Sequence, residues 1–237
     1  MQNKEFVCAC TLRTFGIDSE RFEKICDDLR TEDIDIKFEE HDLVGKIFIS
    51  KNSVDNIALE NVLNKINVRL EDYIYADKDN EINYCLVKKL IKQGEMIAVA
   101  ESITGGMICS SLCDIKGASD VFYEGIVSYN SGSKVRRLHV PATSIQEYTA
   151  VSKEVCEAML KGVLSNKEVK YGIVTTGYAN HNEKDKEGLA YVGYGSLENF
   201  RIEEVKFTGH RNQIRSKVAN YAMFKLLMSI DDYKRKY

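Results

Sequence analysis

The sequence predicts a layered α/β domain preceded by a smaller α+β unit, and three observations lead to this prediction. From Ile97 onward, short apolar runs typical of buried strands alternate with amphipathic stretches typical of helices. Earlier in the chain the order is strand, helix, two strands and helix. Between these parts, Asp72 to Glu81 (DYIYADKDNE) is polar and is expected to be a linker. The expected domains are therefore residues 1–75 and 82–237.

The elements of the smaller unit follow from the spacing of its apolar residues. Phe6 to Leu12 is expected to form a strand, and Asp18-Ser19-Glu20 is a helix start signal. Alternating apolar residues over 34–38 and 44–49 predict two paired strands around a polar turn. Ser53 is expected to cap a second helix.

In the larger domain the strands and helices alternate. Strands are expected at 97–100, 125–129, 171–176, 190–195 and 202–207, and helices near 82–92, 105–114, 152–164 and 211–229. Such alternation favours a largely buried sheet covered by helices. The link between the last two strands, Ser196 to Phe200, is short, so these strands are expected to form an antiparallel hairpin.

Composition excludes several classes of function. A net charge of −3 gives no electrostatic reason to expect a nucleic-acid or membrane partner. No apolar run is long enough to span a bilayer, and the first ten residues are too polar for a signal peptide. Seven cysteines, an odd number without metal-ligand spacing, are expected to be reduced. We therefore expect a cytoplasmic protein with no metal site.

The stretch Ala98 to Leu112 reads as a buried strand, a tight turn and a helix. Its turn, Glu101 to Gly106 (ESITGG), places hydroxyls and glycines where amide N–H groups at a helix start point outward. Such a turn suits a phosphate, a carboxylate or a developing oxyanion. Alternatively, Ser102 or Thr104 only caps the helix and the glycines only allow close packing. These residues by themselves leave both interpretations open.

The turn also resembles the E-S-C-T-G-G motif of the CinA C-terminal family, the nicotinamide-mononucleotide deamidases, with Ile103 in place of the cysteine. Further motifs agree in the same order between about 84 and 230. These are Gly117-Ala118-Ser119 with Phe122, Gly125 to Tyr129, Lys134, Leu138 with Val140-Pro141, Ala150-Val151-Ser152, Thr176-Gly177, and Phe207 with Gly209, Arg211 and Arg215.

The first half resembles the middle, KH-like domain of full-length CinA proteins. Thr11 to Ile17 (TLRTFGI) is similar to the L-R-T-F-G-I that opens that domain, and Asp72 to Tyr75 resembles its end. The resemblance implies a KH-like fold for residues 1–75. We find no G-x-x-G loop and no basic cluster that would indicate RNA binding. The molybdopterin-binding-like domain of the full-length family has no counterpart here, so its pyrophosphatase activity is not expected.

The resemblance implies hydrolysis of the amide of nicotinamide mononucleotide, giving nicotinic acid mononucleotide and ammonia in pyridine nucleotide salvage. It assigns Ser102 as the nucleophile and Lys134 as its base, with Tyr129 nearby. Neither a cofactor nor a metal is expected, and the partners are a small-molecule nucleotide and further copies of the chain, as a dimer or larger assembly. The expected substrate-binding residues are Thr104, Gly105 and Gly106, whose amides suit an oxyanion or phosphate, Thr176, Gly177, and Arg215, which can pair with the phosphate or with an opposing acid.

Taken singly, these side chains also have plainer interpretations. Lys134 beside Arg136 and Arg137 is typical of a solvated charge cluster, Tyr129 of a half-buried strand residue, and Arg215 of an exposed helix face. The histidines are expected to be structural or exposed, with His181 the one inside an altered loop.

The chain departs from the family after Thr176-Gly177. The family's I-A-G-P-G-G is replaced by Tyr178 to Glu183 (YANHNE), which has no glycine or proline. If this loop shapes the nucleotide pocket, the activity or the substrate changes with it. Two alternatives to the deamidase therefore stay open: a non-catalytic binding or regulatory protein, and an amidohydrolase for a related amide.

Overall fold

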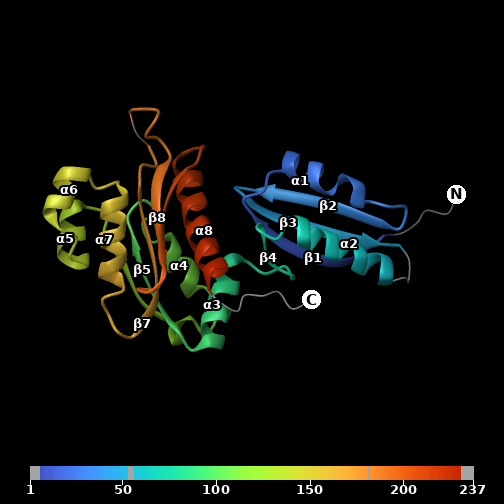
Figure 1. Cartoon of the computed structure of the whole chain (residues 1–237), viewed down its shortest axis with the longest axis horizontal. Helices are drawn as coiled ribbons and strands as arrows, with labels where there is room; N and C mark the ends of the chain where they lie inside the picture. The colour runs from blue at the N-terminus through green and yellow to red at the C-terminus, as the bar shows by residue number, and fades with distance from the viewer. Residues whose placement is uncertain (1–5, 53–55, 181, 231–237) are drawn as a thin grey trace. The chain divides into compact units, whose positions relative to one another are not determined.

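The structure, a computed structural model, describes residues 6–52, 56–180 and 182–230. These residues form two compact units that divide between Glu81 and Ile82, and each unit has its own sheet (Figure 1). No helix in the described part of the chain combines the length and apolar character needed to cross a membrane. All seven cysteines are free thiols.

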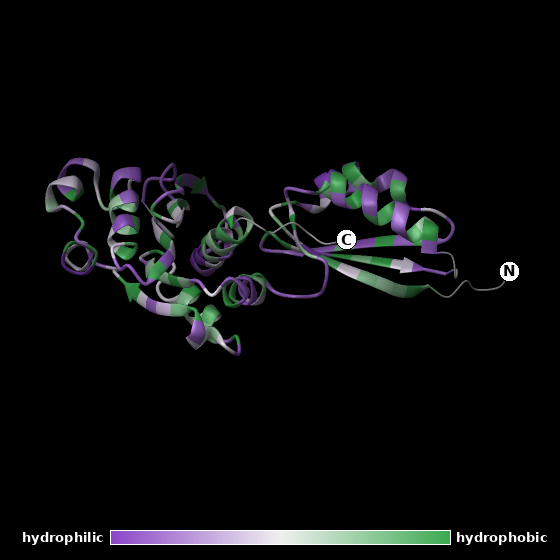
Figure 2. Ribbon diagram, turned by 60° about the horizontal axis from the view of Figure 1, so that its bottom comes forward, coloured by the Kyte–Doolittle hydropathy of each residue, from purple (hydrophilic) through white to green (hydrophobic). Residues whose placement is uncertain are grey.

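The first unit is a four-stranded antiparallel sheet in the order β2-β3-β1-β4 with helices over one face (Figure 2). Its strands are β1 (Val7–Phe15), β2 (Ile34–His41), β3 (Val44–Lys51) and β4 (Ile74–Ala76), and its helices are α1 (Ser19–Cys26), α2 (Asn56–Arg69) and a short 3-10 turn, Asp27–Leu29. Asp18 begins α1 as expected, since its Oδ1 accepts the Arg21 amide at 2.8 Å. The expected cap at Ser53 lies outside the described residues. Apolar side chains of both helices pack with those of the strands in one core.

The polar segment expected to be a linker contains a buried strand, so the expectation is wrong for Ile74–Ala76. These residues form β4, which pairs with β1 only at Arg13 and Thr14. Arg13 is itself buried, and its guanidinium forms ion pairs with Asp79 at 3.1 Å and Glu81 at 2.5 Å. The acids that make the segment polar therefore neutralise a buried cation of this unit.

The second unit is a five-stranded mixed sheet in the order β6-β5-β7-β8-β9. Strand β5 is parallel to both its neighbours, and β7, β8 and β9 are antiparallel, with the expected hairpin between β8 and β9. The strands are β5 (Met96–Glu101), β6 (Phe122–Val127), β7 (Val169–Gly177), β8 (Leu189–Gly195) and β9 (Phe200–Lys206).

Helices cover both faces of this sheet (Figure 1). One layer holds α5 (Ser131–Leu138), α6 (Ala142–Tyr148) and α7 (Lys153–Val163), and the other holds α3 (Ile82–Gln93), α4 (Met107–Cys113) and α8 (Arg211–Ser229), with a 3-10 turn at Ala118–Asp120. The structure is thus the layered α/β architecture that the sequence predicts. Strand β5 lies inside the sheet, between β6 and β7, and is buried. The chain leaves it where helices flank the sheet on both sides.

Two local differences from the sequence expectation affect the site. Strand β6 ends at Val127 instead of Tyr129, and the Ser128 amide makes the last bond of its pairing with β5, to the Glu101 carbonyl at 2.7 Å. The short helices α5 and α6 were not expected. Helix α5 begins at a local cap, where Asn130 Oδ1 accepts the Gly132 amide at 2.8 Å.

Candidate active site

The parallel arrangement of β5 and β7 places the residues that follow them at one edge of the sheet. Ser102 comes directly after β5, and its amide donates to the Thr175 carbonyl at 2.9 Å. On the other side, Ser128 bonds to the Glu101 carbonyl. Ser102 is therefore held between the ends of β6 and β7, with only 8% of its surface exposed.

Lys134 of α5 meets Ser102 at this edge. Its Nζ lies 2.9 Å from Ser102 Oγ and donates to the Ser128 carbonyl oxygen at 2.6 Å. The side chain is 1% exposed, and burial lowers the pKa of the Lys134 amine from 10.5 to about 8. The structure thus brings together the two residues assigned as nucleophile and base, in a hydrogen-bonded pair.

The interpretation of Lys134 as part of a solvated cluster is wrong. Arg136 and Arg137, its neighbours on α5, are exposed, whereas Lys134 faces the sheet. A helix turns about 100° per residue, so charged residues that are adjacent in the sequence point in different directions. Only the tertiary structure shows which member of this basic run is buried.

Glu101 is a residue of this site whose role the sequence analysis missed. Its carboxylate is fully buried, and Oε2 accepts the Gly106 and Ile108 amides at 2.9 and 3.2 Å while Oε1 accepts the Cys109 amide at 2.8 Å. These amides belong to the start of α4, where N–H groups lack helical partners and attract negative charge. The available signal was an acidic residue at the very end of an apolar strand.

This carboxylate fixes the shape of the turn after β5. Gly105 and Gly106 both have positive φ, of 60° and 97°, which favours glycine. The Gly106 amide, expected to bind a phosphate or an oxyanion, already donates to Glu101. Within the described residues, the amides of Ile103, Thr104 and Gly105 have no hydrogen-bond partner. Ile103 and Thr104 are buried, and Gly105 is exposed.

Neither hydroxyl of the turn caps α4, so the plainer interpretation of Ser102 and Thr104 is wrong. Ser102 Oγ contacts Lys134, and Thr104 Oγ1 lies 2.7 Å from Thr175 Oγ1. Thr104 is fully buried. Its contact with Thr175 links the turn to β7.

Arg215 of α8 supports the same turn from the opposite helical layer. Its Nε donates to the Ile103 carbonyl at 3.1 Å, and its Nη2 donates to the Thr104 carbonyl at 2.8 Å. A Cβ added at Gly105 would lie 3.0 Å from that Nη2. Arg215, expected to meet a phosphate or an acid, thus binds backbone carbonyls of the turn in this structure, and its substrate contact stays a prediction.

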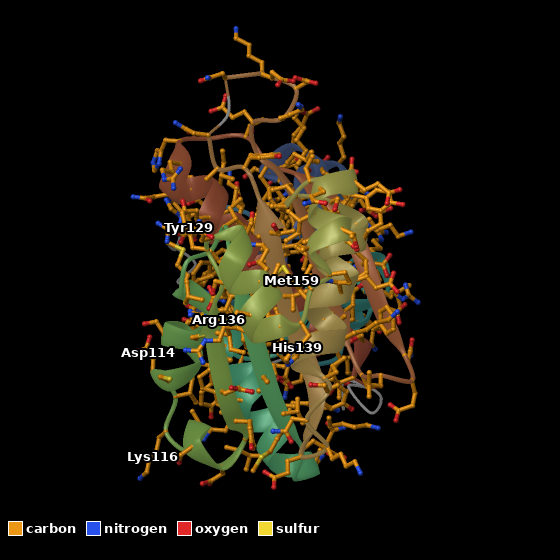
Figure 3. All side chains as sticks on the ribbon, turned by 90° about the vertical axis from the view of Figure 1, so that its left-hand side faces the viewer. Asp114, Lys116, Tyr129, Arg136, His139 and Met159 are labelled. Carbon is orange, nitrogen blue, oxygen red and sulfur yellow. The ribbon has the colours of Figure 1, made fainter. Side chains whose placement is uncertain are left out.

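The other expected site residues lie around this centre without joining it. Tyr129, labelled in Figure 3, is 63% exposed. Its hydroxyl accepts from Nη2 of Arg211, the first residue of α8, at 2.9 Å. Thr176 is buried and its hydroxyl donates to the Ala150 carbonyl at 2.8 Å. Gly177 packs so closely on Ala190 that a Cβ there would lie 2.6 Å from the alanine Cβ. Their roles toward a substrate stay predictions.

The altered loop begins at the same edge of the sheet, because it follows β7. Tyr178 extends the hairpin pairing of β7 and β8 by exchanging backbone hydrogen bonds with Leu189 and Gly188, both at 2.8 Å. His181 lies outside the described residues. Over the described parts of the chain, no group of three or more His, Cys, Asp or Glu side chains is arranged to hold a metal ion.

The sequence profile of the CinA C-terminal domain matches residues 79–230. A protein of Acetivibrio thermocellus, described as competence-damage inducible, is 31% identical over 86% of this chain and 52% of its own length. A CinA-like protein of Fusobacterium nucleatum is 33% identical over 90% of this chain and 54% of its own length. The chain therefore spans about half the length of the curated relatives it matches.

Solved structures agree on the fold of the second unit. A competence-damage inducible protein of Agrobacterium tumefaciens has a TM-score of 0.58 and 26% identity, covering 63% of this chain and 96% of its own. A CinA superfamily protein of Escherichia coli has a TM-score of 0.60 at 23% identity, over 63% of this chain and 88% of its own.

Proposed function

Because this chain belongs to the CinA family, we propose that it hydrolyses a carboxamide, with nicotinamide mononucleotide as its substrate. The observation that carries the proposal is the buried contact of 2.9 Å between Lys134 Nζ and Ser102 Oγ. A serine hydroxyl is a weak nucleophile unless a base removes its proton. A buried amine with a pKa of about 8 supplies such a base near neutral pH.

The reaction divides into two acyl transfers. Ser102 Oγ attacks the carboxamide carbon as its proton passes to neutral Lys134, and the resulting ammonium then protonates the departing nitrogen, so ammonia leaves and a Ser102 ester remains. Water attacks this ester, Lys134 takes one water proton, and that proton returns to Ser102 Oγ as the carboxylic acid leaves. The second water proton departs with the acid, which ionises in solution. Each cycle consumes one water and releases one ammonia, with both residues restored.

The amides of Thr104 and Gly105 are the proposed donors to the oxyanion. They belong to the turn that contains Ser102, and within the described residues neither N–H group donates a hydrogen bond. Glu101 and Arg215 hold this turn from its two sides. Donors fixed before the reaction stabilise developing charge without reorganisation, which commonly contributes several kcal/mol to catalysis, about 3 kcal/mol for a single donor.

The test is release of ammonia and nicotinic acid mononucleotide from nicotinamide mononucleotide. We expect Ser102→Ala and Lys134→Met each to lower kcat by at least about 1,000-fold, and the double variant to lose little more, because the pair acts as a unit. Ser119→Ala and Lys161→Met change exposed residues of the same types and are expected to keep full activity. A Ser102→Ala protein that retains deamidation would refute the proposal.

One observation favours a second candidate, a binding or regulatory protein without turnover. The loop that replaces the family's glycines and proline starts at the edge where Ser102 lies, and Tyr178 within it is fixed by two backbone hydrogen bonds. Side chains with a Cβ restrict how closely backbone amides approach a ligand. Calorimetric binding of the nucleotide with no ammonia released would favour this candidate. Ammonia released from another carboxamide in a panel would instead indicate a shifted substrate.

A further inference from the structure

The first unit contains a cavity of about 430 Å³, separate from the residues discussed above. It lies where the sheet is incomplete, since β4 pairs with β1 only at Arg13 and Thr14. The remaining part of β1 has no strand on that side within the described residues. The lining comes from β1, one face of α2 and the residue after β4: Cys10, Leu12, Glu60, Leu63, Asn64, Asn67 and Asp77.

Asn67 is the unusual member of this lining. Its side chain belongs to α2 and is only 7% exposed, yet its Oδ1 has no hydrogen-bond partner among the described residues. Buried amide groups in proteins are almost always paired, because an unpaired one loses its bonds to water without compensation. The amide of Asn67 therefore lacks a partner that a bound molecule can supply. A half-turn of the amide presents either Oδ1 or Nδ2 to that molecule.

The remaining lining indicates the chemistry of the occupant. Leu12 and Leu63 give the cavity an apolar floor, and most of the cavity surface is apolar. Glu60 and Asp77 are exposed carboxylates at its edge, and neither forms an ion pair or hydrogen bond within the described residues. Two unpaired acids beside an apolar surface favour a positively charged group on an apolar body.

We propose that this cavity binds a small organic cation that carries N–H donors, such as an alkyl or arylalkyl amine. The apolar body occupies the space over Leu12 and Leu63, and the ammonium lies among Glu60, Asp77 and the Asn67 amide. An ammonium has three donors, which is enough for one carbonyl oxygen and two carboxylates. The site belongs to the first unit and does not depend on the proposed deamidase activity.

The proposal is tested on the full chain by NMR titration of the ¹⁵N-labelled protein with 2-phenylethylamine. We expect saturable shifts at α2 and the first half of β1. 2-Phenylethanol has the same body without the charge, and tetraethylammonium has the charge without N–H donors. Each is expected to bind at least tenfold more weakly than the amine. Absence of saturable binding by the amine, or equal binding by the alcohol, would overturn the proposal.

Variants of α2 locate the binding within the cavity. Asn67→Leu is expected to weaken amine binding at least tenfold and to raise the thermal midpoint, since it replaces an unpaired buried amide with an apolar side chain. A higher midpoint also shows that the variant folds. Asn61→Leu changes an exposed residue of the same helix outside the lining and is expected to leave binding unchanged. Undiminished binding by a folded Asn67→Leu protein would show that the cavity is not the site.

A double variant tests the two acids without changing the apolar part of the lining. Glu60→Gln combined with Asp77→Asn is expected to bring the affinity for 2-phenylethylamine down to that for 2-phenylethanol. Both residues are exposed and unpaired within the described structure, so the fold is expected to tolerate the change. Amine affinity that stays above that of the alcohol in this variant would contradict the charged part of the proposal.

Discussion

Lys134 Nζ donates to the carbonyl oxygen of Ser128 at 2.6 Å, and this bond fixes the amine toward Ser102. A neutral amine has two donors and one lone pair. With one donor bound to the carbonyl, the lone pair can accept the Ser102 proton across the 2.9 Å contact. The carbonyl therefore acts as a positioning group for the proposed base.

The first prediction concerns the pH dependence of activity. Burial lowers the Lys134 pKa to about 8, and only the neutral amine accepts a proton. We expect kcat/KM for nicotinamide mononucleotide to rise with pH through an apparent pKa near 8, so that about a tenth of the plateau is reached at pH 7. Ammonia release measured from pH 6 to 9.5 checks this, and a flat profile over that range contradicts it.

The second prediction concerns how stability changes with pH, because the lowered pKa of Lys134 determines the direction of that change. The folded pKa of Lys134 is about 8 and its ordinary value is 10.5, so between these pH values the unfolded chain binds more protons. The cost of burying the ammonium is fully present below pH 8 and disappears as the pH rises to 10.5. As the pH rises across this window, the free energy of unfolding of wild type should increase by on the order of 3 kcal/mol relative to that of Lys134→Met. Urea unfolding of both proteins at pH 7 and 10.5 measures it, and a constant difference argues against a buried ammonium.

The third prediction concerns Glu101, whose two carboxylate oxygens together accept three amides. In Glu101→Gln one oxygen becomes an NH₂ group that faces N–H donors, which costs about 1–3 kcal/mol of stability. The turn that holds Ser102 should loosen, and kcat should fall at least about tenfold. Glu157→Gln, a partly exposed acid paired with Lys161, should change stability by less than about 0.5 kcal/mol. Unaltered kcat in Glu101→Gln would show that the carboxylate does not position the nucleophile.

The fourth prediction concerns Arg215. Its planar guanidinium reaches two carbonyls at once, which a lysine ammonium cannot do in the same geometry. We expect Arg215→Lys to lower kcat/KM about 10–100-fold, while Arg201→Lys, an exposed arginine on β9, has no effect. If Arg215 also binds the substrate phosphate, the variant should discriminate less between the nucleotide and its dephosphorylated nucleoside. Equal activity of Arg215→Lys and wild type would exclude both roles.

The fifth prediction concerns the altered loop. Replacing residues 178–182 with the family's glycines and proline should raise kcat/KM for nicotinamide mononucleotide, because Cβ atoms no longer limit approach to the backbone. The graft is compared with native protein, with the circular dichroism spectrum as a control for folding. A graft that folds and changes nothing, in a native protein that is already fully active, would make the loop a neutral variation.

Elements with a strong apolar period could be predicted from the sequence. The limits expected for the last helix, 211–229, agree with those of α8, and β5 and β7 differ from their expected ranges by at most two residues at each end. Strand β4 was missed because three buried residues inside a charged segment carry no period, and they pair with β1 at Arg13 and Thr14, sixty or more positions earlier.

The sequence could predict which residues belong to the candidate site, but only partly how these residues are arranged. Ser102 and Lys134 came from the family resemblance. Asn130 is a local cap signal for α5, but which basic residue of α5 is buried becomes evident only when the helix packs. Glu101 was visible in the motif, but its three amide partners require the turn to be closed. Tyr129 was expected within a strand because β6 was extended by two residues beyond its end at Val127.

The contact between Arg215 and the carbonyls of Ile103 and Thr104 also has a consequence for the order of synthesis. The partners are more than 110 positions apart, so a nascent chain exposes Ser102 long before α8 leaves the ribosome. Until then the turn lacks the support that α8 gives it. A chain that ends before Arg215 is therefore expected to hold the turn around Ser102 less firmly than the full chain does.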